Sequence, residues 1–131
     1  MKILDGRKLS EIQIAALAKK VEGLPAGQRP GLVVIRVGED PASKIYVTKK
    51  VETCQKIGFY SQEILLPATV SQEVLENKIR ELNSDARVHG ILVQLPLPKH
   101  IDADKVIELI DPIKDVDGFH PYNIGRLVLK M

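Results

Sequence analysis

Apolar positions in the first part of the chain follow a helical pattern and then a strand pattern. Over residues 7–22 they recur at helical spacing, and Gly23 with Pro25 ends the run. The residues of this apolar face are Leu9, Ile12, Ala16 and Leu17. Residues 31–38, GLVVIRVG, are rich in β-branched side chains, which is typical of a strand buried on both faces. We therefore expect an amphipathic helix followed by a central strand.

The middle of the chain carries local signals for where elements begin and end. Asp40 is a good N-cap residue, Pro41 fits the first helical position, and Gly58 is a common stop, which predicts a helix to about residue 57. Thr69 and Gln72 have the spacing of a capping box and predict the start of a further helix. The remaining elements are predicted at residues 59–66 (strand), 72–83 (helix), 89–95 (strand), 102–110 (helix) and from about 123 onward (helix).

Helices thus alternate with strands that look buried rather than half-exposed. This order implies the α/β class, a three-layer α/β/α fold with a parallel sheet flanked by helices. With 131 residues, of which 44% are hydrophobic, residues 1–131 suffice for one domain with its own core. The chain ends within NIGRLVLKM without a cap or polar tail, so we expect a shortened chain or one half of a longer protein.

Composition narrows the range of partners. Charged residues make up 27% of the chain, the net charge is +2, and basic residues form no long run, so no nucleic-acid partner is predicted. No apolar run approaches the roughly 20 residues that cross a bilayer, so no membrane partner is predicted either. A single cysteine and the absence of a signal-peptide core at the start favour a cytoplasmic location.

The adjacent lysines of DPASKIYVTKK differ in direction. At about 100° per residue, Lys50 shares the arc of Val47 and Val51, whereas Lys49 falls on the polar side of the helix. Lys50 has two interpretations: its stem packs while its ammonium reaches water, or it faces a cleft and acts as a general acid or base. Tyr46, one turn earlier, is either a half-buried aromatic at the helix edge or a wall of that cleft.

Segments that follow the predicted strands deserve weight because ligands of open α/β sheets bind outside the carboxyl ends of the strands. Gln94 is placed either to hold the lysine amine or a substrate carbonyl, or to tie down its own loop. Asp115 and Asp117 either accept hydrogen bonds from a ligand or form an Asx-turn beside Gly118.

Other chemistries have little support. The three histidines lack metal-ligand spacing, so no metal site is predicted. Cys54 lies on the apolar arc of its helix and is more typical of a small core residue than of a nucleophile. The segment VGEDPAS contains neither GxGxxG nor GK[ST], so neither a dinucleotide nor a nucleoside triphosphate is predicted to bind there.

Three segments together resemble a known enzyme family. They are VGEDPASKIYVTKKVETCQKIGF, GILVQLPLP and PIKDVDGFHPYNIGRL, in that order. The chain resembles the amino-terminal catalytic domain of the bifunctional methylenetetrahydrofolate dehydrogenase/cyclohydrolase family along essentially its whole length. VQLPLP and KDVDGFHP are the most specific parts of the match.

The resemblance implies roles for individual residues. Lys50 matches the catalytic lysine, Gln94 the glutamine that hydrogen-bonds it, and Tyr46 the tyrosine that stacks on the aminobenzoyl ring of the folate. Asp117 matches the aspartate that holds the pterin. The remaining matches are Ser43 in the wall of the active site, and Pro98 and Gly118 in the surrounding loops.

The implied reactions are the NADP-dependent oxidation of 5,10-methylenetetrahydrofolate to 5,10-methenyltetrahydrofolate, and its hydrolysis to 10-formyltetrahydrofolate. Purine, methionine and histidine biosynthesis use such one-carbon units, and a homodimer is expected for the full-length family. The family's NADP-binding domain has no counterpart in these 131 residues, so no cofactor is expected to bind this chain alone.

Two other classes of function remain open at the sequence level. One is a non-catalytic module that binds a small ligand. The other is a regulatory or interaction domain of the flavodoxin-like type, which shares the layered architecture but not VQLPLP or KDVDG.

Overall fold

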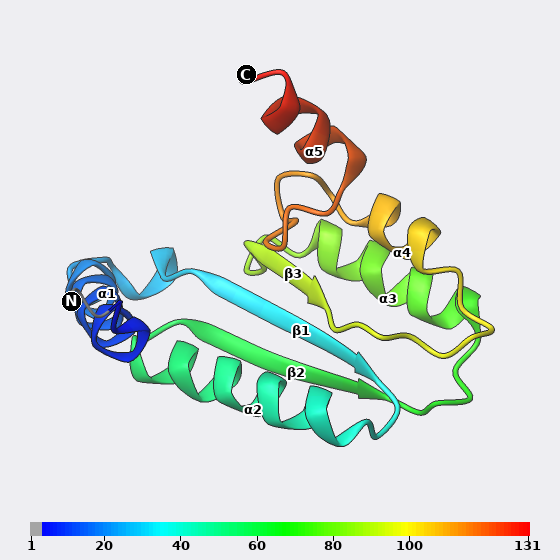
Figure 1. Cartoon of the computed structure of the whole chain (residues 1–131), viewed down its shortest axis with the longest axis horizontal. Coiled ribbons are helices and arrows are strands. Elements are labelled where there is room, and N and C mark those ends of the chain that lie inside the picture. Colours follow the sequence, from blue (N-terminus) through cyan, green and yellow to red (C-terminus); the bar gives the residue numbers. More distant parts are fainter. Residues whose placement is uncertain (1–3) are drawn as a thin grey trace.

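A parallel three-stranded sheet forms the centre of the fold (Figure 1). The computed structural model describes residues 4–131. Its strands are β1 (Gly31–Val37), β2 (Tyr60–Leu66) and β3 (Gly90–Val93), in the spatial order β2-β1-β3. The helices are α1 (Gly6–Glu22), α2 (Pro41–Lys56), α3 (Gln72–Ser84), α4 (Ala103–Leu109) and α5 (Pro121–Val128), with a short 3-10 turn, η1 (Ala26–Gln28). The predicted three-layer α/β/α class is confirmed.

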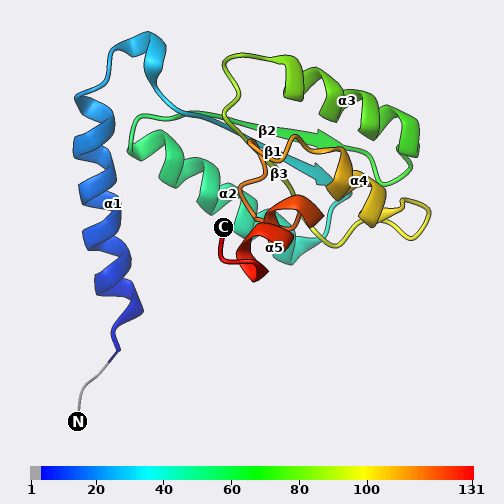
Figure 2. The same cartoon turned by 90° about the horizontal axis from the view of Figure 1, so that it is seen from above.

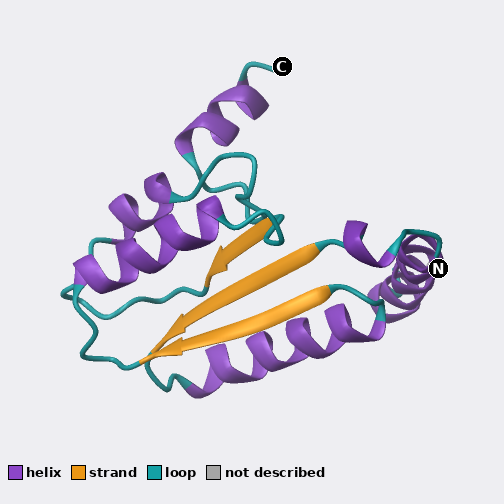
Figure 3. Ribbon diagram, turned by 180° about the vertical axis from the view of Figure 1, so that it is seen from behind, coloured by secondary structure: helices purple, strands orange, loops and turns teal. Residues whose placement is uncertain are grey.

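The strand order explains why helices cover both faces. The chain moves from β1 to β2 in one direction through α2, and then crosses back past β1 to β3 through α3. Because crossover connections between parallel strands are right-handed, opposite directions of travel place the two helices on opposite faces. Figure 2 shows α2 and α3 on the two sides of the sheet, and Figure 3 shows the strands between them.

The face beneath α3 and α4 carries the larger core. Alternate residues of β1 point to this side, and Val33 and Ile35 are fully buried there. Leu75 and Ile79 of α3 and Val106 of α4 are also fully buried and pack into the same cluster. The β-branched composition of β1 and β3 therefore reflects burial on both faces, as predicted.

The opposite face is covered by α2 and has a smaller apolar core. Val34 of β1 and Leu92 of β3 pack against Val47 of α2. The helix begins where expected, because the Asp40 carboxylate accepts a hydrogen bond from the Ser43 N–H at 2.7 Å. It ends before Gly58, whose φ of +85° suits the left-handed conformation of a helix stop.

Three details differ from the sequence predictions. Ser71, not Thr69, caps α3: the Val70 N–H bonds the Pro67 carbonyl in a turn, which leaves Thr69 outside the helix. The strand β2 is not buried on both faces, because its residues are either exposed or only partly buried. The third strand is limited to residues 90–93, since the chain leaves the sheet at Gln94, before the cis Leu95–Pro96 peptide bond.

The first helix forms where predicted, but its apolar face is not packed on the sheet. Leu9 and Ile12 remain more than half exposed, and Val21 at its end is the residue of α1 that is buried. Figure 2 shows α1 projecting away from the layers. Within residues 4–131, no helix combines the length and the apolar character needed to cross a bilayer.

Candidate functional site

Lys50 and Gln94 meet on the face of the sheet that α2 covers. The Lys50 Nζ donates a hydrogen bond to the Gln94 Oε1 over 3.3 Å, across 44 residues of sequence. Lys50 is partly buried, whereas Lys49 is exposed. The helical wheel therefore separated the two lysines correctly, and Lys50 does not simply extend its ammonium into water.

The backbone and the amide group of Gln94 are both held in place. Its N–H bonds the Ile35 carbonyl at 2.8 Å, which attaches the residue to β1. Its Nε2 donates to the Leu95 carbonyl at 2.8 Å, so the amide oxygen is left to face the lysine. Both sequence interpretations of Gln94 are thus realised at once: it ties down its own loop, and that bond orients its oxygen toward Lys50.

Tyr46 stands on the same side of α2 as Lys50 and is 65% exposed. This exposure argues against the half-buried interpretation and leaves one face of the ring available for stacking. The two side chains line an open groove of about 350 Å³ between α1 and α2. The exposed Lys49 lines its rim, and Ile14, Leu32 and the buried Cys54 line the rest. Burial raises the pKa of the Cys54 thiol, which fits the predicted core role rather than a nucleophile.

Asp115 and Asp117, which the sequence could not tell apart, have different environments. The Asp115 carboxylate accepts bonds from the N–H groups of Gly118 (3.0 Å) and His120 (2.9 Å) and from the Asn123 amide (2.9 Å). Burial acts to raise the pKa of Asp115, but these bonds outweigh it and hold that pKa below its usual value. Asp115 thus has the structural role of the predicted turn.

Asp117 has no such partners: within residues 4–131, its carboxylate accepts no hydrogen bond. Lost hydration raises the pKa of Asp117, the nearby Lys50 ammonium opposes this shift, and Asp115 adds to it. The side chain is nonetheless exposed at the surface. An unpaired carboxylate near Lys50 is suited to accept N–H groups from a ligand.

The other predicted site residues lie around this centre. Ser43 is 5% exposed, and its N–H belongs to the α2 cap, so it supports the start of the helix. The Pro98 carbonyl accepts the Ile101 N–H at 2.9 Å and shapes the loop after β3. Gly118 has a φ of +70°, a conformation that favours glycine.

Two neighbours of the site carry no clear signal in the sequence. Ile14 reaches the groove from α1, although the helical pattern did not place it on the predicted apolar face. Asn123 holds the Asp115 carboxylate, and its position after a proline gave no indication of that contact. In the described part of the chain, histidine, cysteine and acidic side chains form no cluster that could hold a metal.

The residues after β1 do not fit a dinucleotide. Pyrophosphate groups bind at the amino end of a helix, where free N–H groups and the dipole attract negative charge. At the amino end of α2, the Asp40 carboxylate occupies that position, and the pKa of Asp40 is lowered by its hydrogen bond from the Ser43 N–H. Two adjacent acidic residues, Glu39 and Asp40, repel a phosphate there.

Comparison with known proteins identifies the family of the chain. Residues 4–117 match the model of the family described as "Tetrahydrofolate dehydrogenase/cyclohydrolase, catalytic domain". The Bifunctional protein FolD of a Nitratiruptor species is 53% identical over 130 residues, which cover 98% of this chain and 46% of that protein. The chain therefore spans about half the length of this relative.

Solved structures give the same result. The bifunctional FolD enzyme from Campylobacter jejuni matches with a TM-score of 0.97 and 45% identity, over 100% of this chain and 47% of that one. FolD from Trypanosoma brucei, complexed with NADP cofactor and inhibitor, matches with a TM-score of 0.92 and 38% identity, over 96% and 43%. The chain thus belongs to the tetrahydrofolate dehydrogenase/cyclohydrolase family, and it corresponds to the catalytic domain of that family.

Proposed function

We propose that this chain, as one domain over residues 1–131, supplies the folate cleft and the catalytic lysine of a one-carbon tetrahydrofolate enzyme. The reactions are the oxidation of 5,10-methylenetetrahydrofolate and the hydrolysis of the 5,10-methenyl product to 10-formyltetrahydrofolate. The observation that carries this proposal is the 3.3 Å bond between the Lys50 ammonium and the oriented Gln94 oxygen, inside a chain of this family.

Hydrolysis of the methenyl bridge is a proton-transfer problem that these residues fit. Water adds to the bridging carbon and loses one proton, which gives a neutral carbinol. The bond from the carbon to ring nitrogen N5 then breaks as N5 takes up a proton, and the carbinol hydroxyl releases its own proton to solvent, which leaves the formyl group on N10. A lysine beside the bridge can accept the first proton in its neutral amine form and then, as an ammonium, return it to N5. We assign this transfer to Lys50, with Gln94 fixing the direction of its amine.

Tyr46 and Asp117 are assigned to substrate binding. The exposed Tyr46 ring offers a flat face on which the aminobenzoyl ring of the folate can stack. The Asp117 carboxylate, close enough to Lys50 for their charges to interact, can accept the N–H groups of the pterin. Ser43, Pro98 and Gly118 shape the surrounding wall and loops.

The remaining proposals concern the cofactor, the oligomeric state, the location and the metabolic role. The oxidation needs NADP as hydride acceptor, and we place its binding in the additional length of the relatives, because the residues after β1 do not fit it. We further propose a homodimer, a cytoplasmic location, and a supply of one-carbon units for purine, methionine and histidine biosynthesis.

The test combines binding and turnover on matched variants. Calorimetry with 5-formyltetrahydrofolate should show binding that weakens on Tyr46→Ala. Loss of the methenyl absorbance of 5,10-methenyltetrahydrofolate should slow by about 10²- to 10⁴-fold in Lys50→Met, the usual contribution of a general acid or base. Lys44→Met, on the exposed side of α2, is the matched control and should leave both measurements unchanged.

Two outcomes would overturn parts of the proposal. Hydrolysis by Lys50→Met at the rate of Lys44→Met would remove Lys50 from its assigned role. Folate binding without any acceleration of hydrolysis by the unchanged chain would instead support the alternative function, a small-ligand binding module without activity.

A further inference from the structure

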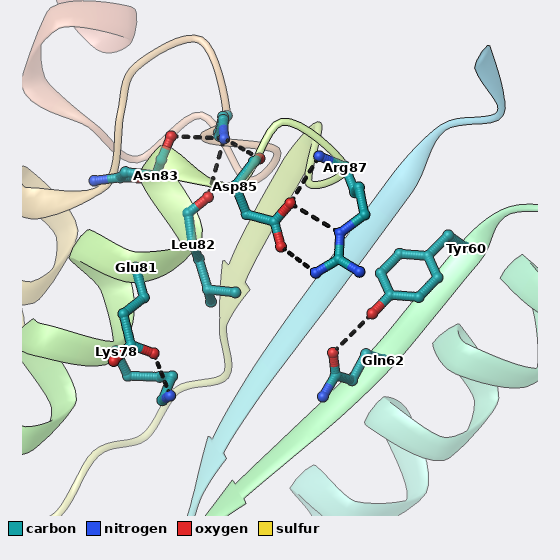
Figure 4. A network of polar contacts seen from close by, with 9 residues as sticks. Tyr60, Gln62, Lys78, Glu81, Leu82, Asn83, Asp85 and Arg87 are labelled. Carbon is teal, nitrogen blue, oxygen red and sulfur yellow. Dashed lines mark hydrogen bonds and ion pairs between the residues drawn. The ribbon is translucent and has the colours of Figure 1, made fainter. Parts of the chain in front are cut away.

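Lys114 makes an unusual set of contacts for a lysine in a surface loop. Its ammonium donates to three backbone carbonyls, those of Leu82 (2.9 Å), Asn83 (2.7 Å) and Asp85 (2.9 Å). Figure 4 shows these carbonyl oxygens converging on one nitrogen at the end of α3. All three donors of the ammonium are therefore used, at the carboxyl end of a helix, where positive charge is favoured.

The backbone of Lys114 is attached to the sheet at the same time. Its carbonyl accepts the Ile91 N–H of β3 at 2.8 Å, and its own N–H bonds the Asp111 carbonyl at 2.7 Å. The next residue, Asp115, forms a parallel bridge with Ile91. One residue thus fastens the loop both to the carboxyl end of α3 and to the start of β3.

Lys114 lies three residues before Asp117, and a second set of hydrogen bonds fixes the residues that follow Asp117. The Asp115 carboxylate binds the N–H groups of Gly118 and His120, which closes the turn on the far side of Asp117. Val116 packs over Gly90, where an added Cβ would lie 2.5 Å from its Cγ1. The backbone around Asp117 therefore has little freedom, while its carboxylate keeps its hydrogen-bonding capacity for a ligand.

We infer that Lys114 is a positioning residue that holds Asp117 in place beside Lys50 for pterin binding. The inference rests on the proposed function, because Asp117 is assigned to the pterin there. Lys114 touches no substrate in this assignment. Its effect on a ligand passes through the position of the Asp117 carboxylate.

A double-mutant cycle separates this role from a purely structural one. Lys114→Met should weaken 5-formyltetrahydrofolate binding by roughly 10- to 100-fold, as expected for the displacement of a binding group by about an ångström. In the Asp117→Asn background the same substitution should have little further effect, because the group it positions is already altered. Ile79→Val is the matched control: it loosens the buried face of α3 without touching the loop, and it should leave affinity unchanged.

A second measurement does not depend on folate binding. The carboxyl carbon of Asp117 can be titrated by NMR in the unchanged chain, in Lys114→Met and in Ile79→Val. Loosening the loop changes the distance of the Asp117 carboxylate from the Lys50 ammonium and from Asp115, so the pKa of Asp117 should change in Lys114→Met alone.

The outcomes distinguish the two proposals. Equal losses of affinity in both backgrounds, or an unchanged Asp117 titration in Lys114→Met, would show that Lys114 only stabilises the fold and would overturn the inference. If the unchanged chain binds no folate while the titration shifts as expected, the positioning role stands and the assigned ligand is wrong.

Discussion

The two faces of the central strand β1 pack against apolar cores of different size. On one side Val33, Ile35 and Val37 enter a core that comprises thirteen buried apolar residues of the described chain, under α3 and α4. On the other side Val34 belongs to a core of three such residues, and the neighbouring Arg36 is a cation that is only 4% exposed.

Lys50, Tyr46 and Gln94 lie toward the second face, whereas Asp117 also lines a small pocket with Ile91 and Val93 of the first face. Lys50 and Tyr46 project from α2, Gln94 leaves β3 beside them, and Val116 brings the Asp117 loop over Gly90. Burying polar groups reduces the apolar area that drives folding. The molecule therefore concentrates stability under α3 and α4 and leaves the α2 face free for chemistry. The predictions below test this division.

The largest effect is expected from the stability face. Leu75→Ala removes a fully buried side chain from the core and should lower the free energy of unfolding by about 2–5 kcal/mol in urea titrations. Val74→Ala, at a neighbouring position that is 51% exposed, should cost little. Folate affinity per folded molecule should be the same in both variants. A loss of affinity in Leu75→Ala would show that the two faces are coupled.

A smaller effect is expected where the site loop meets the sheet. Gly90→Ala places a Cβ 2.5 Å from the Val116 Cγ1 and 3.2 Å from the Leu32 Cδ1, so the loop must move. We expect a cost of about 1–3 kcal/mol from overpacking, together with weaker folate binding in calorimetry. Adding Val116→Ala should recover much of both losses. Full affinity in Gly90→Ala alone would mean that the Asp117 loop tolerates displacement.

The elements could be predicted from the sequence because their signals are local. The capping of α2 by Asp40, Pro41 at its first position and the stop at Gly58 each act within a few residues. The same local argument failed at Thr69, because Ser71 offers a second hydroxyl two residues later and a turn places Thr69 outside the helix. Helix periodicity also distinguished Lys50 from Lys49, since direction around a helix follows from spacing alone.

The rest of the site depends on contacts that spacing does not encode. Asp115 and Asp117 flank one residue and look alike in sequence, yet one is saturated by hydrogen bonds and the other is not. Lys114 binds backbone carbonyls 29–32 residues away, and a carbonyl acceptor leaves no trace in residue identity. Family resemblance supplied the assigned roles of Tyr46 and Asp117, which the residues alone left open.

The buried cation of the α2 face can be tested directly. The Arg36 Nε donates to the Glu63 Oε1 at 2.9 Å, and its Nη1 donates to the Gly38 carbonyl at 2.8 Å. The hydrogen bond with Glu63 raises the pKa of Arg36 against the opposing effect of burial. Glu63→Gln should lower the free energy of unfolding by roughly 1–2 kcal/mol, because a buried charge loses its main partner while keeping others. No change in a urea titration would show that Glu39 and Gly38 suffice.

The smallest effect is expected from the ion pair between Asp85 and Arg87, which follows the end of α3. Asp85 accepts the Arg87 N–H at 2.8 Å and pairs with the Arg87 guanidinium, and these bonds lower the pKa of Asp85 to about 2 (Figure 4). A carboxylate with a depressed pKa stabilises the folded state above its ordinary pKa near 4. That contribution is lost as the pH falls from about 4 toward 2.

Asp85→Asn should therefore reduce stability modestly at pH 6, and its difference from the unchanged chain should shrink as the pH falls from about 4 to 2. Urea titrations at pH 6, 4 and 2.5 measure that difference, with Glu11→Gln on the exposed side of α1 as the control. The control should differ little from the unchanged chain at every pH. A constant difference for Asp85→Asn would mean that the Arg87 contact stabilises the turn by shape rather than by charge. The pair of Asp85 and Arg87 would then stabilise the folded state through packing, as the core beneath α3 does.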